Sequence, residues 1–188
     1  MHTSLERALA RHGGPVLLGR KPAAMFPLPV SGAAHAHPAR LCDGALSLNI
    51  LWRRPCHELI LIYRPPLLEK TLAAPDARAA LIDLGYPAHG GAEALLACLR
   101  RRFQTAEDFP HEVGFFLGYP TEDVTGFIEH KGRGCKLSGP WKVYGDVARA
   151  QALFSEYEQC RTYLLAHIAR GGSLQTLSPA CELAISYH

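Results

Sequence analysis

The chain has 188 residues, of which 48% are hydrophobic and 20% are charged, and its formal net charge is +3. This composition is typical of a globular domain and differs from that of disordered chains, while the small excess of basic residues argues against a dedicated nucleic-acid binder. No apolar run approaches the 18 or so residues that cross a bilayer, and the N-terminus lacks the apolar core of a signal peptide. We therefore expect a single domain over residues 1–188 of a cytoplasmic protein, with no nucleic-acid or membrane partner.

The N-terminal third of the chain predicts one helix followed by strands. Residues 4–11 place apolar side chains at helical spacing, and residues 15–29, which contain four prolines, predict an extended strand or loop. Residues 46–53 alternate apolar and polar side chains with Leu51 as the exception, and residues 57–64 are apolar without alternation. Together the last two runs predict a β-hairpin whose second strand is buried on both faces.

Beyond residue 65 the apolar spacing becomes helical. Helices are predicted at residues 67–73, 75–84 and 93–104, and two more are predicted to begin at the aromatic-proline steps Phe109-Pro110 and Tyr119-Pro120. The three arginines at 100–102 lie on the outer side of their helix and predict a solvated basic face. The acidic residues Glu112, Glu122 and Asp123 are expected in first turns, where the helix dipole favours them.

The C-terminal part of the chain predicts a short strand and one long helix. Residues 135–144 are interrupted by Gly and Pro and predict an edge strand. Asp146 then precedes the longest helical pattern, in which apolar residues step by three and four until Gly171. These elements predict an α+β fold, in which a central β-hairpin or small, mostly antiparallel sheet packs against several helices.

The spacing of the six cysteines argues against a metal cluster, because no two of them are two to four residues apart. Cys98 and Cys160 lie on apolar helical stripes and are expected in the core. His35 and His37, with Cys42 nearby, offer the alternative of a small metal site. The Gly, Ala and Pro residues around them favour a surface loop, so we predict no metal site.

One region of the sequence is too particular for a generic helix. It reads FPHEVGFFLGYPTEDVTGFI at residues 109–128, and WKVYGD follows at 141–146. These strings, together with Cys160, resemble those of domain-of-unknown-function family 3793, whose members carry FPHEIG, FLGYP, GFI and WKVYGD. Two earlier blocks, GRKPAAMF at 19–26 and YRPPLLE at 63–69, resemble the family as well.

The resemblance covers residues 13–172 and leaves 173–188 as a C-terminal tail. It implies a cytoplasmic protein of anaerobic bacteria, with a link to flavodoxin and iron-uptake genes and therefore to redox or iron physiology, and it implies no reaction. Many relatives have a Cys before the proline that corresponds to Pro15, which implies a shared thiol at that position. This chain has Gly13 and Gly14 before Pro15, so a thiol nucleophile is not expected here.

His111 is the candidate catalytic residue, because an imidazole beside a carboxylate can act as an acid or base near neutral pH. Its neighbour Glu112 is the nearest carboxylate in the sequence. Consecutive side chains on a helix point about 100 degrees apart, so the two do not face one substrate without help. A structural role for Glu112 at the start of a helix is the alternative.

A basic segment at residues 130–136 and the strand after it are candidates for anion binding, because glycine backbone beside Lys and Arg can surround a phosphate or carboxylate. The ordinary alternative is that these cations complement the end of a helix. Aromatic side chains nearby predict a stacking wall for a flat ligand such as a flavin or tetrapyrrole, although core packing is favoured for Trp141. The candidate ligand-binding residues here are Tyr119, Lys131, Arg133, Lys136, Trp141, Lys142 and Tyr144.

Lys21 completes the candidate set, because a lysine held in an apolar, conformationally restricted stretch can have a lowered pKa. A plain surface position is the alternative. Our leading hypothesis is a ligand-binding or accessory protein with a basic-aromatic site for an anionic small molecule, and no particular cofactor is assigned. The alternatives are an enzyme that uses His111 as acid or base, and an interaction module whose Arg100–Arg102 face binds an acidic, flavodoxin-like partner.

Overall fold

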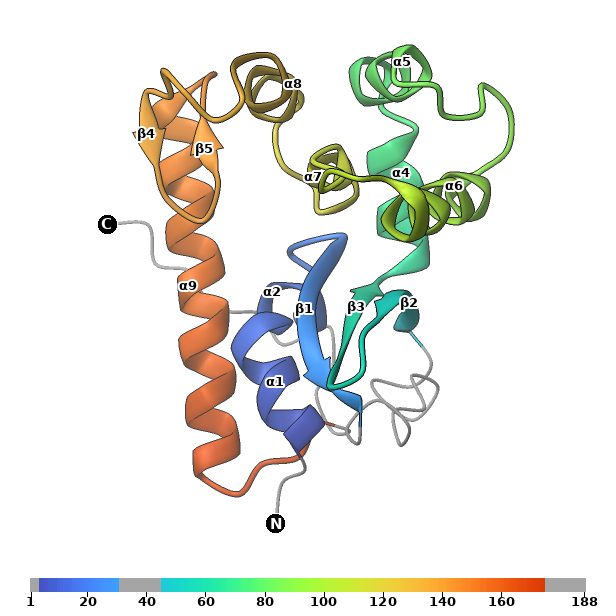
Figure 1. Cartoon of the computed structure of the whole chain (residues 1–188). Helices are drawn as coiled ribbons and strands as arrows, with labels where there is room; N and C mark the ends of the chain where they lie inside the picture. The colour runs from blue at the N-terminus through green and yellow to red at the C-terminus, as the bar shows by residue number, and fades with distance from the viewer. Residues whose placement is uncertain (1–3, 31–44, 175–188) are drawn as a thin grey trace.

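The structure, a computed structural model, describes residues 4–30 and 45–174. A three-stranded antiparallel sheet lies at its centre, in the order β1 (Ala23–Pro29), β3 (His57–Tyr63), β2 (Ser47–Arg53). The turn between β2 and β3 is closed by the Arg54 amide, which donates to the His57 carbonyl at 2.8 Å. The sheet is packed with helices, so the α+β class and the hairpin predicted from the sequence are confirmed (Figure 1).

The central strand β3 is buried on both faces, as its unbroken apolar run predicts. Leu59, Leu61 and Tyr63 belong to one hydrophobic cluster, whereas Ile60 and Ile62 belong to another on the opposite face. Side chains of a strand alternate between the two faces, so one apolar run serves both layers.

Leu51, the exception in the alternating pattern of β2, occupies a β-bulge. Ile50 pairs with Ile60 and Trp52 pairs with Leu59, so Leu51 is the extra residue between them. Its side chain is fully buried in the cluster that contains Leu59 and Leu61. The bulge therefore adds one core residue to β2, and the side chains on either side of it keep the sheet faces that their pairing with β3 gives them.

One face of the sheet is covered by helices from the middle of the chain. Aliphatic and aromatic side chains from these helices surround Leu59, Leu61 and Tyr63. The predicted helices at 67–73, 75–84 and 93–104 are present, with ends that differ by one or two residues. The helices of this layer are α4 (Pro65–Leu72), α5 (Pro75–Asp83), α6 (Ala92–Thr105), α7 (Val113–Phe116) and α8 (Thr121–His130).

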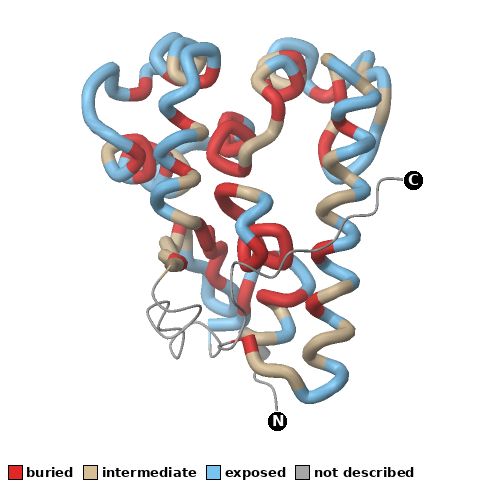
Figure 2. The backbone as a smooth tube through the Cα atoms, turned by 180° about the vertical axis from the view of Figure 1, so that it is seen from behind, coloured by how far each residue is buried: buried red, intermediate tan, exposed pale blue. Residues whose placement is uncertain are grey.

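The other face is covered by segments from the two ends of the described chain. The helices α1 (Ser4–His12) and α2 (Gly14–Leu17) lie between the sheet and α9 (Val147–Ala169), as Figure 1 shows. Cys160 and Leu164 of α9 are buried there, and the side chain of Asp146 caps the helix by accepting from the Arg149 amide at 3.0 Å. In Figure 2 the buried residues gather in the interior, and exposed residues run along the outer side of α9.

Three predicted elements differ from the structure. Residues 15–29 begin with α2 and become a strand only from Ala23. Residues 135–144 do not join the central sheet, because Leu137–Ser138 (β4) pairs with Lys142–Val143 (β5) in a hairpin of its own. The helix predicted from Phe109-Pro110 is reduced to α7, because Gly118 has a φ of 73° and ends it after one turn.

Candidate functional site

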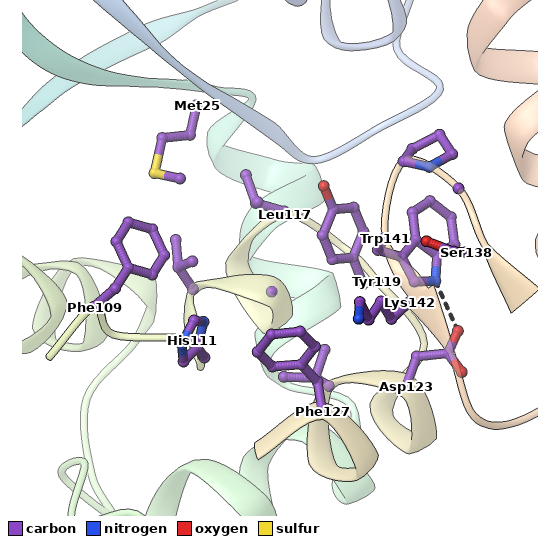
Figure 3. A pocket seen from close by; sticks show the side chains of 15 residues that line it. Met25, Phe109, His111, Leu117, Tyr119, Asp123, Phe127, Ser138, Trp141 and Lys142 are labelled. Carbon is purple, nitrogen blue, oxygen red and sulfur yellow. Dashed lines mark hydrogen bonds between the residues drawn. The ribbon is translucent and has the colours of Figure 1, made fainter. Parts of the chain in front are cut away.

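A cleft of about 340 Å³ lies between β1, α7, α8 and the β4–β5 hairpin. Most of its lining is aromatic or apolar, and the contributing side chains come from segments far apart in the sequence. Figure 3 shows Phe109 and His111 at one end of the cleft and Tyr119 and Trp141 at the other, with Phe127 between them. Met25 and Leu117 lie above these rings in the same view. Three predicted site residues, Tyr119, Trp141 and Lys142, therefore meet His111 around one cavity.

The wall at one end of the cleft is a stack of aromatic rings. The rings of Tyr119 and Trp141 are nearly parallel, with centroids 4.5 Å apart, and Phe154 of α9 packs edge-on against Trp141 at 4.4 Å. Trp141 is only 8% exposed, which agrees with the preference for core packing. One of its faces nevertheless supports the ring of Tyr119 beside the cavity.

Asp123 fixes this wall to helix α8. Its carboxylate accepts hydrogen bonds from the Trp141 indole N–H at 2.7 Å and from the backbone amides of Tyr144 and Gly145 at 2.7 and 2.8 Å. The side chain is 2% exposed, so three donors compensate the burial of its charge. Asp123 lies in the first turn of α8 as predicted, but its role is to hold the β4–β5 hairpin.

His111 and Glu112 point to different neighbours. The imidazole of His111 is exposed and packs against the rings of Phe109 and Phe127, with centroids 5.3 and 4.7 Å away. The buried carboxylate of Glu112 accepts hydrogen bonds from the Tyr86 hydroxyl at 3.2 Å and from Arg102 at 3.1 Å. Glu112 is therefore held by Tyr86 and Arg102, and it does not form with His111 the His–carboxylate pair that acid–base chemistry would use.

Arg102 corrects the prediction of a solvated arginine face. Its guanidinium lies 4.5 Å from the ring of Tyr86, pairs with Glu112, and donates to the Leu84 carbonyl. Glu112 precedes α7 and lies outside its first turn. A buried carboxylate needs a cation more than it needs the dipole of a one-turn helix, which explains why Arg102 turns inward while Arg100 and Arg101 remain exposed.

The basic segment after α8 does not converge on the cleft. Lys142 lines the cleft, and its ammonium donates to the Gly132 carbonyl at 2.6 Å. Lys136 donates to the Gly145 carbonyl at 2.9 Å, while Lys131 and Arg133 are exposed. Lys131 adopts a left-handed conformation with φ 50° at the end of α8, and it lines a separate hollow that includes the other side of His111.

Tyr144 lies outside the cleft. Its ring stacks on His130 at 5.6 Å and packs against the backbone of α8 at Gly126. The hydroxyl is buried and has no hydrogen-bond partner in the part of the chain that the structure describes. The expectation that Tyr144 shares a ligand surface with Lys142 follows from strand alternation, which this two-residue strand does not maintain.

Lys21 lies on the other side of Tyr119. Its ammonium is 4.8 Å from the Tyr119 ring centroid and 5.3 Å from that of Tyr157, and it lines a second cavity of about 380 Å³. Burial lowers the pKa of Lys21 to about 8. Lys21 and the cleft residues thus share Tyr119 as a common wall.

At the position where the family resemblance implies a thiol, the backbone of this chain lies close to the backbone of α9. Gly14 lies against α9, and a Cβ at this residue would be 3.2 Å from Cα of Arg161. A side chain at this position would need α2 or α9 to shift by a few tenths of an ångström. Gly14 thus allows α2 and α9 to approach closely in this chain.

Sequence reasoning missed several residues of the cleft. The local patterns assign Phe109 and Phe127 to helices and Met25 to an extended segment. Asp123 and Phe127 are four residues apart on α8 and both face the cleft, so the i, i+4 spacing within the family-like string was a usable signal. No signal in the sequence placed Met25 beside Phe109.

The described residues contain no group of three or more His, Cys, Asp or Glu side chains able to hold a metal ion. His35, His37 and Cys42, weighed above as a metal site, lie outside the described residues. None of the helices in residues 4–30 and 45–174 combines the length and the hydropathy that a membrane crossing requires.

Comparisons with known proteins give one match. No curated protein and no solved structure matched the chain. A family model described as a protein of unknown function, DUF3793, matches residues 9–178. This range includes the 13–172 segment on which the resemblance was recognised and extends it at both ends. The chain belongs to the DUF3793 family.

Proposed function

We propose that this protein binds a small anionic molecule that has a flat, largely apolar part, and that the aromatic cleft is the binding site. The observation that carries the proposal is the ring wall of Tyr119 and Trp141, which borders the same cavity as Phe109 and Phe127. A concave, mostly apolar site with a few polar groups is the usual form of a small-molecule site.

The cleft is pre-formed, which favours binding. Asp123 holds Trp141 by a 2.7 Å hydrogen bond, and Phe154 supports the indole from behind. A rigid aromatic surface loses little conformational entropy when a flat ligand stacks on it. Stacking against such rings contributes about 1 to 3 kcal/mol per ligand ring in comparable sites.

The preference for an anion rests on Lys142 and His111. Lys142 uses one of its three N–H donors for the Gly132 carbonyl, so two remain for a ligand. His111 is exposed at the opposite end of the cleft and is available to donate. A carboxylate or phosphate at the rim would gain charge-assisted hydrogen bonds from these groups.

Binding is favoured over the two alternatives by geometry. An enzyme with His111 as acid or base would use an orienting carboxylate, and Glu112 is already bound by Arg102 and Tyr86. An interaction module using residues 100–102 would lose Arg102, which is turned inward. The proposal includes a cytoplasmic location and a role in redox or iron physiology, and both points rest on the family resemblance.

Flavin emission provides a direct test, because stacking on tyrosine and tryptophan quenches it. Riboflavin and flavin mononucleotide, which share one ring system and differ in a phosphate, are titrated with the protein. Protoporphyrin IX serves as a second flat probe, followed by its own emission. We expect a saturable change with at least one probe and about tenfold weaker binding for Trp141→Leu and Phe127→Ala.

Trp52→Phe is the matched control, because Trp52 is the other tryptophan of the chain and lies on β2, outside the cleft. It is expected to bind as the unaltered protein does. No saturable signal with any of the three probes would overturn the proposal. Equal affinities for Trp141→Leu, Phe127→Ala and Trp52→Phe would also overturn it.

A further inference from the structure

A second cavity of about 380 Å³ lies between the N-terminal helices and α9, on the far side of Tyr119 from the aromatic cleft. The two cavities share a wall made of Met25, Leu117, Tyr119 and Pro140. The remaining lining of the second cavity differs in character, because it is rich in ionisable side chains. These are Arg11, His12, Lys21, Glu158 and Arg161.

The charge balance of this cavity is positive. Arg11, Lys21 and Arg161 are basic. Among the described residues the lining has one carboxylate, Glu158, which already pairs with Arg161 at 2.6 Å. The pKa of His12 reflects the same excess of positive charge. Burial lowers the pKa of His12, and the positive charges of Arg11 and Arg161 lower it further. A further positive charge is thus disfavoured inside the cavity and a negative one is favoured.

Lys21 is the innermost cation and lacks a counter-charge. Its ammonium lies over the rings of Tyr119 and Tyr157, and no hydrogen bond or ion pair of Nζ is found among residues 4–30 and 45–174. The adjacent Arg20 points elsewhere, with Nε 3.8 Å from Glu156. An enclosed ammonium without an acceptor is costly, and ring faces compensate it only in part.

The backbone holds Lys21 in this position. Its amide donates to the Pro15 carbonyl at 3.1 Å, and the Arg20 amide donates to the same carbonyl at 2.7 Å. Pro22 follows and restricts the conformation of Lys21. The side chain is therefore directed into the cavity by a fixed turn.

We propose that this cavity is an anion site, in which Lys21 contacts a phosphate or carboxylate group of a small molecule while Arg11 and Arg161 neutralise it from the α1 and α9 sides. Such a group supplies the acceptors that Lys21 lacks and compensates the excess positive charge. This site goes beyond the aromatic cleft and does not depend on occupancy of the cleft.

The site has a pH dependence that follows from the groups around Lys21. Burial holds the pKa of the free Lys21 near 8, and a bound anion raises it, so affinity is greatest below about pH 8 and decreases above it. The facing tyrosines, Tyr119 and Tyr157, have pKa values raised by burial and stay neutral in this range. The mutual ion pair lowers the pKa of Glu158 and raises that of Arg161, so both stay charged.

Calorimetric titration tests the site, with inorganic phosphate and succinate as separate probes at constant ionic strength and pH 7.5. Lys21→Met keeps the apolar stem and removes the charge, and Lys70→Met, an exposed position on α4, is the control. We expect at least about tenfold weaker binding for Lys21→Met and no change for Lys70→Met. Phosphate binding alone, or succinate binding alone, supports the site and identifies the anionic group.

A sulfate titration between pH 6.5 and 9.5 supplies the pH profile, because sulfate does not itself titrate there. If Lys21→Met does not fold, ¹⁵N-lysine NMR of the unaltered protein serves instead. Its five lysines give few signals, and the ammonium signal of Lys21 is expected to shift with added anion while that of Lys70 does not. The site is refuted by the absence of binding by both phosphate and succinate, by equal affinities of Lys21→Met and Lys70→Met, or by a flat pH profile.

Discussion

The indole N–H of Trp141 donates a 2.7 Å hydrogen bond to Oδ2 of Asp123, which lies 18 residues earlier in the chain. The other carboxylate oxygen of Asp123 accepts from two consecutive amides after β5. One side chain on α8 therefore determines where the β4–β5 hairpin and its tryptophan lie. The aromatic wall of the cleft depends on this contact.

Asp123→Asn is expected to destabilise the protein by about 2 kcal/mol, because an amide cannot accept from all three donors. The free energy of unfolding from urea titration measures this loss. In a Trp52→Phe background, Trp141 emission reports the loosened wall as a shift to longer wavelength. Glu122→Gln, an exposed neighbour on the same helix, should change neither quantity. A stable Asp123→Asn variant with unchanged emission would contradict the role assigned to this carboxylate.

Arg102→Met is expected to lower the free energy of unfolding by about 2 kcal/mol, because it leaves the buried Glu112 carboxylate with Tyr86 as its remaining partner. Arg100→Met, two residues earlier and exposed, should cost less than about 0.5 kcal/mol. Chemical denaturation of both variants makes the comparison. Similar costs for the two would show that Arg102 does not compensate Glu112.

Lys21 should make stability depend on alkaline pH. Its pKa in the folded protein is about 8, below the ordinary value of 10.5, so between these pH values the unfolded chain binds more protons. The free energy of unfolding therefore rises with pH across this window, by up to about 3 kcal/mol, relative to Lys21→Met. Urea titrations of both proteins from pH 7.5 to 10.5 measure the difference. A constant difference would mean that the folded protein does not lower the pKa of Lys21.

Gly118 and Gly134 provide a matched pair of glycines in left-handed conformations, with φ values of 73° and 66°. A Cβ at Gly118 would lie 2.6 Å from the ring of Pro22, whereas a Cβ at Gly134 meets nothing within 4 Å. Gly134→Ala should cost about 1 kcal/mol for its backbone conformation alone. Gly118→Ala should cost at least about 2 kcal/mol more, because the clash separates Tyr119 from Lys21. Equal thermal stabilities would disprove this contact.

The sequence predicted those elements that are determined by neighbouring residues, through side-chain periodicity and helix capping. The hairpin at residues 46–64 and the long helix after Asp146 follow from side-chain period and capping. Tyr119 and Trp141, both within the family-like strings, were predicted to share a site, and their rings are stacked. Leu51 stood out as a break in alternation, but only the pairing of Ile50 and Trp52 across β3 shows that a bulge absorbs it.

Contacts between distant segments could not be predicted in this way. Lys21 meets Tyr157 although 135 residues separate them in the chain, and no periodicity records such a contact. The pattern of its own helix predicts that Arg102 is solvated. Its side chain turns inward because it pairs with Glu112, ten residues later in the chain. The arrangement of the second cavity depends on how α1 and α9 pack together, which is a property of the folded chain.

The location of α9 has a consequence for biosynthesis. The cluster around Leu59 and Leu61 draws on residues 23–124, whereas the cluster around Ile60 and Ile62 also requires Cys160 and Leu164. On the ribosome, one face of the sheet can be covered while the other still waits for its last helix. At ordinary elongation rates the 40 residues from 124 to 164 take roughly 2 to 8 seconds. During that interval the side of α1 and α2 that α9 later covers is an exposed apolar surface, and a chaperone that acts during translation would bind there.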